Sequence, residues 1–372
     1  MHNAVMDYEI EFHPVGDNTK AGDAISVRYA ENGVYRVIVI DGGTTDCGKA
    51  LVEHINRFYG ADTVISHVIS THPDNDHASG LREILKAFPV ENFWIHGIWH
   101  HAPEMLPYFE DGWTQHDLQN AIRDAYPIVA ELIDLAEERG ISIYEPFAGA
   151  SIGPFSVLSP QRSEYVRLVP QFRRTPGANQ TLLEAQAFWL GTRKQGFFAQ
   201  LVERAVQWIG EAWDVELLRE NPTTAAENES STVLLGQFGD RKAILTGDAG
   251  VNALRWACDY ADEHGLNRSS PELIQVPHHG SRSNVSPSVL DCLIGPKLPW
   301  GTPASRTAVV SCPKDDAKHP RKMVVNAFMR RGCAVHKTQG AYIRHHHGNM
   351  PARGNEKSAE AFQWFDQVEA YD

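Results

Sequence analysis

The chain has 372 residues, 42% of them hydrophobic and 22% charged, with a formal net charge of −13. These values are ordinary for a globular protein with a sizeable core. They exclude a broad surface for non-specific nucleic-acid binding, because Lys and Arg neutralising phosphate supply most of that affinity. The net charge does not exclude a small basic groove. No apolar stretch reaches the ~18 residues of a membrane span, so no transmembrane helix is expected.

Two features predict the compartment. The first 14 residues lack the basic start and apolar core of a signal peptide. The five cysteines are odd in number and have no close paired spacing, which favours reduced thiols over a disulfide frame or a zinc ribbon. We therefore expect a cytoplasmic protein.

In chain order, the first half alternates strand and helix patterns. Strands are expected at 24–29, 35–41, 64–70, 92–95, 141–144 and 155–158. Helices are expected at 49–59, 78–88 and 115–139, the last with Pro127 as a point for a kink. In the second half, short apolar runs predict strands at 242–245 and 273–276.

We expect a single domain over residues 1–348, interrupted by an insertion at about 161–224. A helical stretch is expected within this insertion, from Gly196 to Glu220. It serves either as a substrate lid or partner surface, or as an extra helix packed on the core. The C-terminal tail, 349–372, is polar up to Phe362 and is expected to dock on the body.

The run His72-Pro73-Asp74-Asn75-Asp76-His77 directly follows a probable strand. Its two imidazoles and two carboxylates can converge on one point, and together they suit Zn²⁺, Mn²⁺ or Fe. The alternative is a polar loop whose carboxylates cap the next helix.

Other strand-like runs also end in Asp or His. They lead into Asp41-Gly42-Gly43, Thr246-Gly247-Asp248 and Pro277-His278-His279-Gly280-Ser281. Because α/β folds collect ligands and catalytic groups at the carboxyl ends of their strands, these side chains are expected to meet the 72–77 cluster.

These motifs resemble the metallo-β-lactamase superfamily, and within it the hydrolase domain of ComEC-type DNA-uptake proteins and their stand-alone relatives. The resemblance runs from about residue 22 to about residue 342, with two stretches that do not align. Its motifs are Gly22-Asp23-Ala24, Ile40–Gly43, Ser70–His77, Val157–Pro160, Asn228–Leu234, Leu245–Asp248, Val276–Ser281 and His319-Pro320. It implies an α/β fold of the αββα type, a sandwich of two mixed β-sheets flanked by helices, here with the helical insertion.

The resemblance also implies two divalent metal ions, Zn or Mn, bridged by Asp248. One ion would be held by His72, Asp74 and Asp248, and the other by Asp76, His77, Asp248 and His279. The third histidine of the wider superfamily is missing at the first ion, where Asn228-Glu229-Ser230-Ser231 stands instead. This oxygen-rich set favours Mn²⁺ or weakly held Zn²⁺.

Such a pair of ions, ~3.5–4 Å apart, would bind a bridging hydroxide and clamp an anionic oxygen of the substrate. Asp76, His278 and His319 are the candidate catalytic residues. His278 is expected to face the substrate or to be a buried structural histidine. His319 is expected to contact the substrate or donate a proton to the leaving group. Asp41 is expected to orient a ligand histidine, which is compatible with shaping its own turn.

The roles of two further groups of histidines and of one serine stay open. His96, His100 or His101 could supply the missing nitrogen ligand, although such histidines are more often structural. The run 345–347 resembles a metal-binding tract but is expected to end an exposed strand. Ser281 either binds a phosphate oxygen or caps a helix.

Three functions remain. The first is a metal-dependent phosphodiesterase or nuclease, which the resemblance favours and which leaves nucleic acid open as a partner. The second is a hydrolase of a small molecule such as a lactone, thioester or phosphorylated metabolite, which the acidic charge favours. The third is a non-catalytic binding protein of the same fold, against which the full set of ligand residues argues.

Overall fold

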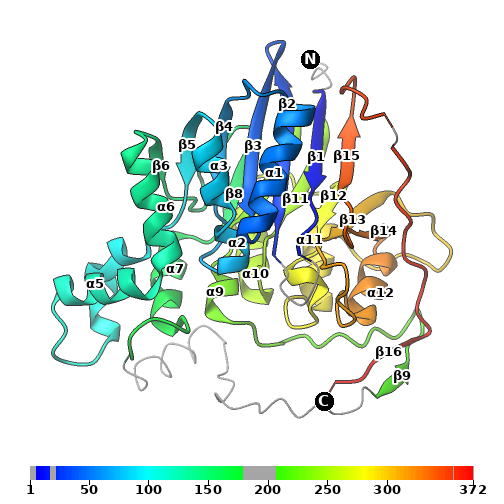
Figure 1. Ribbon diagram of the computed structural model, residues 1–372. Coiled ribbons are helices and arrows are strands. Elements are labelled where there is room, and N and C mark those ends of the chain that lie inside the picture. The colour runs from blue at the N-terminus through cyan, green and yellow to red at the C-terminus, as the bar shows by residue number, and fades with distance from the viewer. Residues whose placement is uncertain (1–5, 17–21, 179–206, 355, 372) are drawn as a thin grey trace.

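The computed structural model describes residues 6–16, 22–178, 207–354 and 356–371. Within these residues the core is a pair of mixed seven-stranded sheets with helices on their outer faces (Figure 1). The expected αββα sandwich of two mixed sheets flanked by helices is therefore confirmed.

Sheet 1 has the strand order β15-β1-β2-β3-β4-β5-β6. Its strands are β1 (Tyr8–Phe12), β2 (Ala24–Glu31), β3 (Val34–Gly42), β4 (Ile65–Ile69), β5 (Val90–Trp94), β6 (Ser142–Tyr144) and β15 (Ile343–His347). Pairing is antiparallel from β15 to β3 and parallel from β3 to β6.

Sheet 2 has the order β14-β13-β12-β11-β10-β8-β7. Its strands are β7 (Ser151–Ile152), β8 (Phe155–Ser159), β10 (Val233–Phe238), β11 (Arg241–Leu245), β12 (Leu273–Gln275), β13 (Arg306–Val310) and β14 (Cys333–Lys337). Here too an antiparallel part, β7 to β11, joins a parallel part, β11 to β14. The two halves of the chain thus build sheets of similar plan.

The helices lie between these strands in the sequence. They are α1 (Thr45–Phe58), α2 (Asn75–Ala78), α3 (Leu81–Ala87), α4 (Ala102–Met105), α5 (Gln115–Ala125), α6 (Pro127–Glu138), α7 (Arg162–Leu168), α9 (Ala226–Glu229), α10 (Val251–Glu263), α11 (Pro287–Ile294) and α12 (Lys322–Arg330). None of the helices in the described parts of the chain has the length and apolar character that crossing a bilayer demands.

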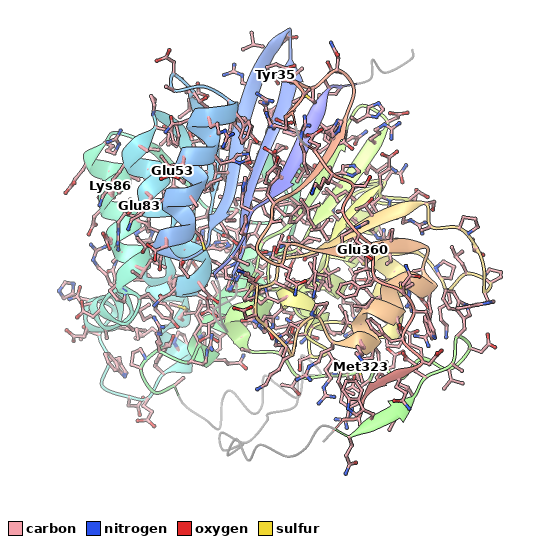
Figure 2. All side chains as sticks on the ribbon, turned by 45° about the vertical axis from the view of Figure 1, so that its right-hand side comes forward. Tyr35, Glu53, Glu83, Lys86, Met323 and Glu360 are labelled. Carbon is pink, nitrogen blue, oxygen red and sulfur yellow. The ribbon has the colours of Figure 1, made fainter. Side chains whose placement is uncertain are left out.

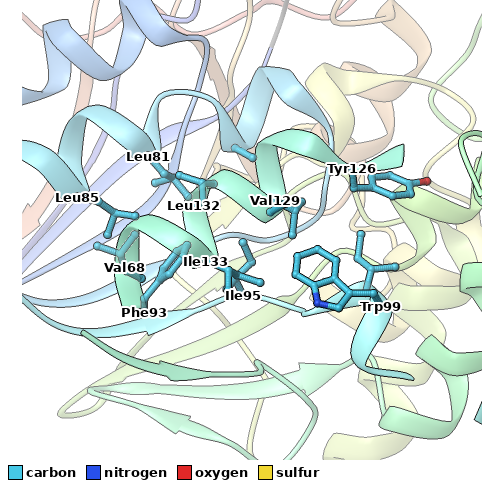
Figure 3. Close-up of a cluster of buried hydrophobic side chains, with 14 of the residues drawn as sticks. Val68, Leu81, Leu85, Phe93, Ile95, Trp99, Tyr126, Val129, Leu132 and Ile133 are labelled. Carbon is cyan, nitrogen blue, oxygen red and sulfur yellow. The ribbon is translucent and has the colours of Figure 1, made fainter. Parts of the chain in front are cut away.

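Three apolar layers hold the sandwich together. In β3 the alternation of side chains sends Val37 and Val39 to the layer beneath the helices, and Ile38 and Ile40 to the layer between the sheets. Figure 3 shows part of the outer layer, where Phe93 of sheet 1 packs with side chains of α3 and α6. A third layer joins sheet 2 to α10, α11 and α12. The opposite faces of α1 and α3 are polar, with Glu53 and Lys86 exposed (Figure 2).

Two expected helices are divided. The helix expected at 115–139 ends at Ala125 and restarts at Pro127, because proline cannot donate the helical hydrogen bond and favours a first helical turn. The helix expected at 78–88 is broken before Leu81. At this break, a Cβ on Gly80 would lie 1.9 Å from the carbonyl oxygen of Gly42, so the backbone of the ligand loop packs directly on the end of β3.

The helix expected at 196–220 is wrong over its described part. Residues 179–206 lie outside the described residues. Beyond them, β9 (Trp208–Gly210) pairs with β16 (Gln367–Glu369) of the tail, and the chain then continues without helix to α9. Glu211 explains this path, since its buried carboxylate binds Arg330 of α12 and cannot face solvent on a surface helix. All five cysteines are free thiols.

Candidate metal centre

The motif residues from both halves of the chain meet where the sheets abut. β3 and β4 of sheet 1 and β11 and β12 of sheet 2 each end in one of the motifs. Asp41, His278 and His279 have positive φ angles of 52°, 46° and 56°. This conformation costs a non-glycine residue of order 1–3 kcal/mol, and here it turns the chain sharply enough to aim the side chains at one point.

Asp41 organises the sheet 1 side of the centre. Its carboxylate accepts hydrogen bonds from the backbone N–H of Thr71 at 2.8 Å and from the Thr71 hydroxyl at 2.6 Å. Oδ2 also accepts from Nδ1 of His77 at 2.9 Å. The carboxylate therefore fixes the orientation of the His77 ring, and the role of Asp41 in orienting a metal ligand stays a prediction.

The tautomer of His72 follows from the same network. The Thr71 hydroxyl donates its only hydrogen to Asp41, so it must accept the 3.0 Å bond from His72. Nδ1 of His72 therefore carries the proton, and Nε2 carries a lone pair.

The two histidines of sheet 2 are fixed in the same way. Nδ1 of His279 donates to the carbonyl oxygen of Ser311 at 3.0 Å. Nδ1 of His278 lies 2.8 Å from Oδ1 of Asn284, whose amide nitrogen donates to the carbonyl oxygen of Asp248. Oδ1 of Asn284 can only accept, so this bond requires a proton on Nδ1 of His278. The amide nitrogen of Asn228, 3.1 Å from the same Nδ1, can only donate and would require a lone pair there, so the shorter bond to Asn284 decides the position of the proton.

All four Nε2 atoms converge on the carboxylate of Asp248. The distances to its nearer oxygen are 3.8 Å from His72, 3.4 Å from His77, 3.7 Å from His278 and 3.8 Å from His279. Among the described residues, Nε2 of His72, Nε2 of His77 and Oδ1 of Asp248 are buried without a hydrogen-bond partner. Buried ring nitrogens that face a carboxylate and have no hydrogen-bond partner fit a divalent cation.

The charges agree with this fit. Burial lowers the pKa of His72, and it lowers that of His279 to about 3, so both rings are neutral at pH 7. Burial also opposes charge on His77, but Asp248 and Asp41 outweigh it and raise its pKa well above the usual range. A proton on His77 and a divalent ion would thus compete for the place beside Asp248, and metal binding would release that proton.

The two carboxylates of the 72–77 loop differ in their surroundings. A ligand oxygen of Asp76 lies within 4.8 Å of ligand nitrogens of His77 and His279, which matches the second expected ligand set. Asp74 lies at the rim, with Oδ2 at 4.0 Å from Nε2 of His72, and it is paired with Arg173 at 2.7 Å. Burial raises the pKa of Asp74, but His72 and Arg173 lower it by more.

Asp23 belongs to this centre, and sequence reasoning named it only as part of a motif. Its carboxylate lies 3.7 Å from Nδ1 of His77 and accepts from the side chain of Gln275 at 2.7 Å. Gln275 in turn accepts from the backbone N–H groups of the Thr246-Gly247 turn. Burial raises the pKa of Asp23 to about 7. Its position directly before a strand, inside a matched motif, was the available signal.

The Asn228–Ser231 motif supports the centre from outside. Asn228 contacts Nδ1 of His278 at 3.1 Å, and Glu229 caps the start of α10 by accepting from the backbone N–H of Ala253 at 2.8 Å. Nε2 of His278 lies beside Asp248, where sequence reasoning expected a nitrogen ligand to be lacking. Its side chain is 36% exposed, so it also borders solvent.

His319 lies near His279, because Pro320, the residue after His319, packs against Gly280, where a Cβ would lie 2.4 Å from Cβ of Pro320. Nδ1 of His319 donates to Asp316 at 3.0 Å, which leaves Nε2 with the lone pair. Because burial lowers the pKa of His319, the ring is neutral at pH 7. This favours a contact with substrate over proton donation.

The histidines left open by sequence reasoning, His96, His100, His101 and His345 to His347, do not join the ligand groups found among the described residues. Nε2 of His101 binds Glu145 at 2.8 Å, and His96 stacks on Tyr165 with ring centroids 4.2 Å apart. His345 to His347 lie in β15, paired with β1. Ser281 is in the turn before α11, where its hydroxyl accepts from the backbone N–H of Ser283 at 3.3 Å.

Comparison with known proteins was made by sequence and by structure. The family model of the metallo-beta-lactamase superfamily matches residues 31–150, which include Asp41 and the 72–77 loop. The match supports assignment to this superfamily. It does not reach Asp248 or His279, which the geometry above brings to the same point. The ComEC-type resemblance is not shown by it, and no curated protein matches the chain.

Solved structures of similar fold include Zn²⁺-bound PqqB from Methylobacterium extorquens, with 10% identity, 90% of this chain and 99% of that chain covered, and a TM-score of 0.42. AidC, a dizinc quorum-quenching lactonase, has 11% identity, coverage of 65% and 67%, and a TM-score of 0.28. The metallo-beta-lactamase MIM-1 from Novosphingobium pentaromativorans has 10% identity, coverage of 76% and 79%, and a TM-score of 0.29. Similarity at this level says nothing of the substrate of this chain.

Proposed function

We propose that the chain is a metal-dependent hydrolase that cleaves phosphodiesters. The observation that carries this proposal is the convergence of four histidines on Asp248 through their Nε2 atoms, while their Nδ1 atoms are engaged in hydrogen bonds. His72, Asp74 and Asp248 would hold one ion, with His278 as a further nitrogen donor. Asp76, His77, Asp248 and His279 would hold the other.

When bound, two divalent ions activate water and neutralise charge on the reacting group. The protein's own groups do the rest. Asp41, Ser311 and Asn284 keep the histidine rings in the ligand tautomer. His319, neutral and partly exposed, is placed to hold the substrate beside the centre.

The phosphodiester is favoured over a neutral ester because a guanidinium, that of Arg173, lies at the rim of the centre and suits an anionic group. A small-molecule lactone or thioester remains the second candidate, favoured by the net charge of −13, which repels polyanions.

The test is metal content of the purified chain together with hydrolysis of bis-p-nitrophenyl phosphate in the presence of Mn²⁺ or Zn²⁺. About two ions per chain with turnover would support the proposal, and DNA, RNA and cyclic nucleotides would follow as substrates. Metal without phosphodiester turnover, but with turnover of a lactone or thioester, would establish the second candidate. A chain that binds no metal under either condition would contradict both.

A further inference from the structure

Arg173 is held at the rim of the centre by two carboxylates from different parts of the chain. Its Nη2 donates to both oxygens of Asp74, at 3.0 and 2.7 Å. Its Nε donates to Glu227 at 3.1 Å, and its backbone N–H binds the same carboxylate. The side chain of Glu227 is only 2% exposed, so it is a fixed anchor.

These contacts use only part of the guanidinium. The hydrogen bonds to Asp74 and Glu227 come from Nη2, Nε and the backbone N–H, and none of them uses Nη1. The side chain as a whole is 54% exposed. An arginine on a protein surface normally moves among many rotamers, whereas this one is held by two carboxylates while about half of its side chain stays open to solvent.

The position of Arg173 beside the candidate metal centre suits its guanidinium to binding an anion. Asp74 links Arg173 to the centre, because its Oδ2 lies 2.7 Å from Nη2 of Arg173 and 4.0 Å from Nε2 of His72. A cation bound by Asp74 would share the charge that now pairs with Arg173, which frees the guanidinium for another anion. Nη1 of the neighbouring Arg174 lies 3.5 Å from Oδ1 of Asn75, so a second guanidinium stands close to the same loop.

We propose that Arg173 is the anion-binding residue of the site and takes a non-reacting oxygen of an organic phosphate whose phosphoryl group lies at the metal centre. Guanidinium groups bind phosphate oxygens through charge-assisted hydrogen bonds, which a neutral ester or lactone cannot offer at that position. The proposal rests on the proposed function for the identity of the substrate, and anion binding can be measured apart from turnover.

The experiment compares the full chain, loaded with Mn²⁺ or Zn²⁺, with R173Q and R173K. Inorganic phosphate is titrated calorimetrically, metal content is measured for each protein, and kcat and KM are determined with bis-p-nitrophenyl phosphate and with the neutral ester p-nitrophenyl acetate. R162Q is the matched control, because Arg162 forms an exposed ion pair with Glu104 away from the centre.

We expect R173Q to keep its metal and to bind phosphate about tenfold more weakly, with R173K between it and the parent protein. KM for the phosphodiester should rise while kinetics with the neutral ester stay unchanged. R162Q should match the parent in every measurement.

Three results would overturn the inference. Loss of metal in R173Q would make Arg173 a positioning residue for Asp74. Equal phosphate affinity in R173Q and the parent, or no phosphate binding by the parent, would remove the anion site. If the parent binds phosphate through Arg173 but hydrolyses no phosphodiester, the proposed function fails while the anion site stands.

Discussion

This molecule has two clusters of histidine and carboxylate side chains that are similar in composition. They differ in which groups hydrogen-bond to the side chains inside each cluster. One is the metal centre around Asp248. The other, which we call the β1 cluster, consists of Glu11, His13 and His54, whose ligand atoms also lie within 4.8 Å of one another.

In the β1 cluster the protein supplies its own donors and its own cation. Glu11 accepts from Tyr59 at 2.5 Å, from His54 at 3.0 Å and from Arg353 at 3.1 Å. Nε2 of His13 is bonded to Ser26 at 2.8 Å. In the metal centre, by contrast, hydrogen bonds engage the Nδ1 atoms and leave the Nε2 atoms facing a carboxylate. This difference is why we propose a metal site at Asp248 and not in the β1 cluster.

The largest effect should come from removing the shared carboxylate of the metal centre. We expect D248N to lose bound metal and to lower kcat by about 10³-fold or more, roughly 4 kcal/mol, because the histidines then surround a neutral group. Elemental analysis and phosphodiester hydrolysis measure both. E11Q, in the β1 cluster, is the control and should keep its metal. D248N with full metal content would contradict the assignment of the centre.

The next effect should come from removing the internal cation of the β1 cluster. The side chain of Arg353 is buried and pairs with Glu9 and Glu11, so R353A removes one cation from this buried carboxylate pair, although Glu9 still pairs with Arg28 and Arg344. We expect the free energy of unfolding in urea to fall by about 3 kcal/mol, with metal content unchanged. R36A removes an exposed arginine paired with Glu31 and should cost about 0.5 kcal/mol or less. Metal loss in R353A would show that the clusters are not independent.

A smaller effect should follow from weakening the network behind His77. D41N keeps the shape of the side chain but removes the charge that holds Nδ1 of His77 and the hydroxyl of Thr71. Metal affinity, measured by competition with a chelator, should fall about 10- to 100-fold. D46N, at the exposed start of α1, is the control. Unchanged affinity in D41N would mean that ring orientation does not depend on this carboxylate.

The smallest effect concerns pH. Burial, helped by the charge of His54, lowers the pKa of His13 to about 3, against an ordinary value of 6.5. Between these values the unfolded chain binds the proton and the folded one does not, so the contribution of His13 to stability is present above pH 6.5 and is lost as pH falls. With chelator present, H13N should reduce the slope of unfolding free energy between pH 6.5 and 5 by up to about 1.4 kcal/mol per pH unit. Parallel slopes for H13N and the parent would contradict this.

The centre could be anticipated from sequence because its ligands follow strands whose carboxyl ends must meet. The residues that complete it could not. Asn284 and Ser311 fix the sheet 2 histidines through contacts between loops within the second half of the chain, which the strand pattern does not record. Arg173 reaches Asp74 across 99 residues of sequence.

Hydrophobic periodicity also failed to predict local structure at two places where a contact with a distant residue determines it. The break before Leu81 exists because the backbone of Gly80 lies against Gly42, and no hydrophobic period records that contact. Apolar residues between 208 and 220 suggested a helix, but pairing with the C-terminal strand and the buried Glu211–Arg330 pair take them elsewhere.

The candidate metal centre draws its residues from both halves of the chain, so it can form only after both have been synthesised. His72 and His77 leave the ribosome with the first half of the chain, whereas His279 follows some 200 residues later. At 5–20 residues per second the delay is roughly 10–40 s. During that time the nascent chain carries two histidines and a few carboxylates without the shared Asp248. If the proposed centre holds metal, loading would therefore be a late event in biosynthesis that requires both halves to be completed and joined.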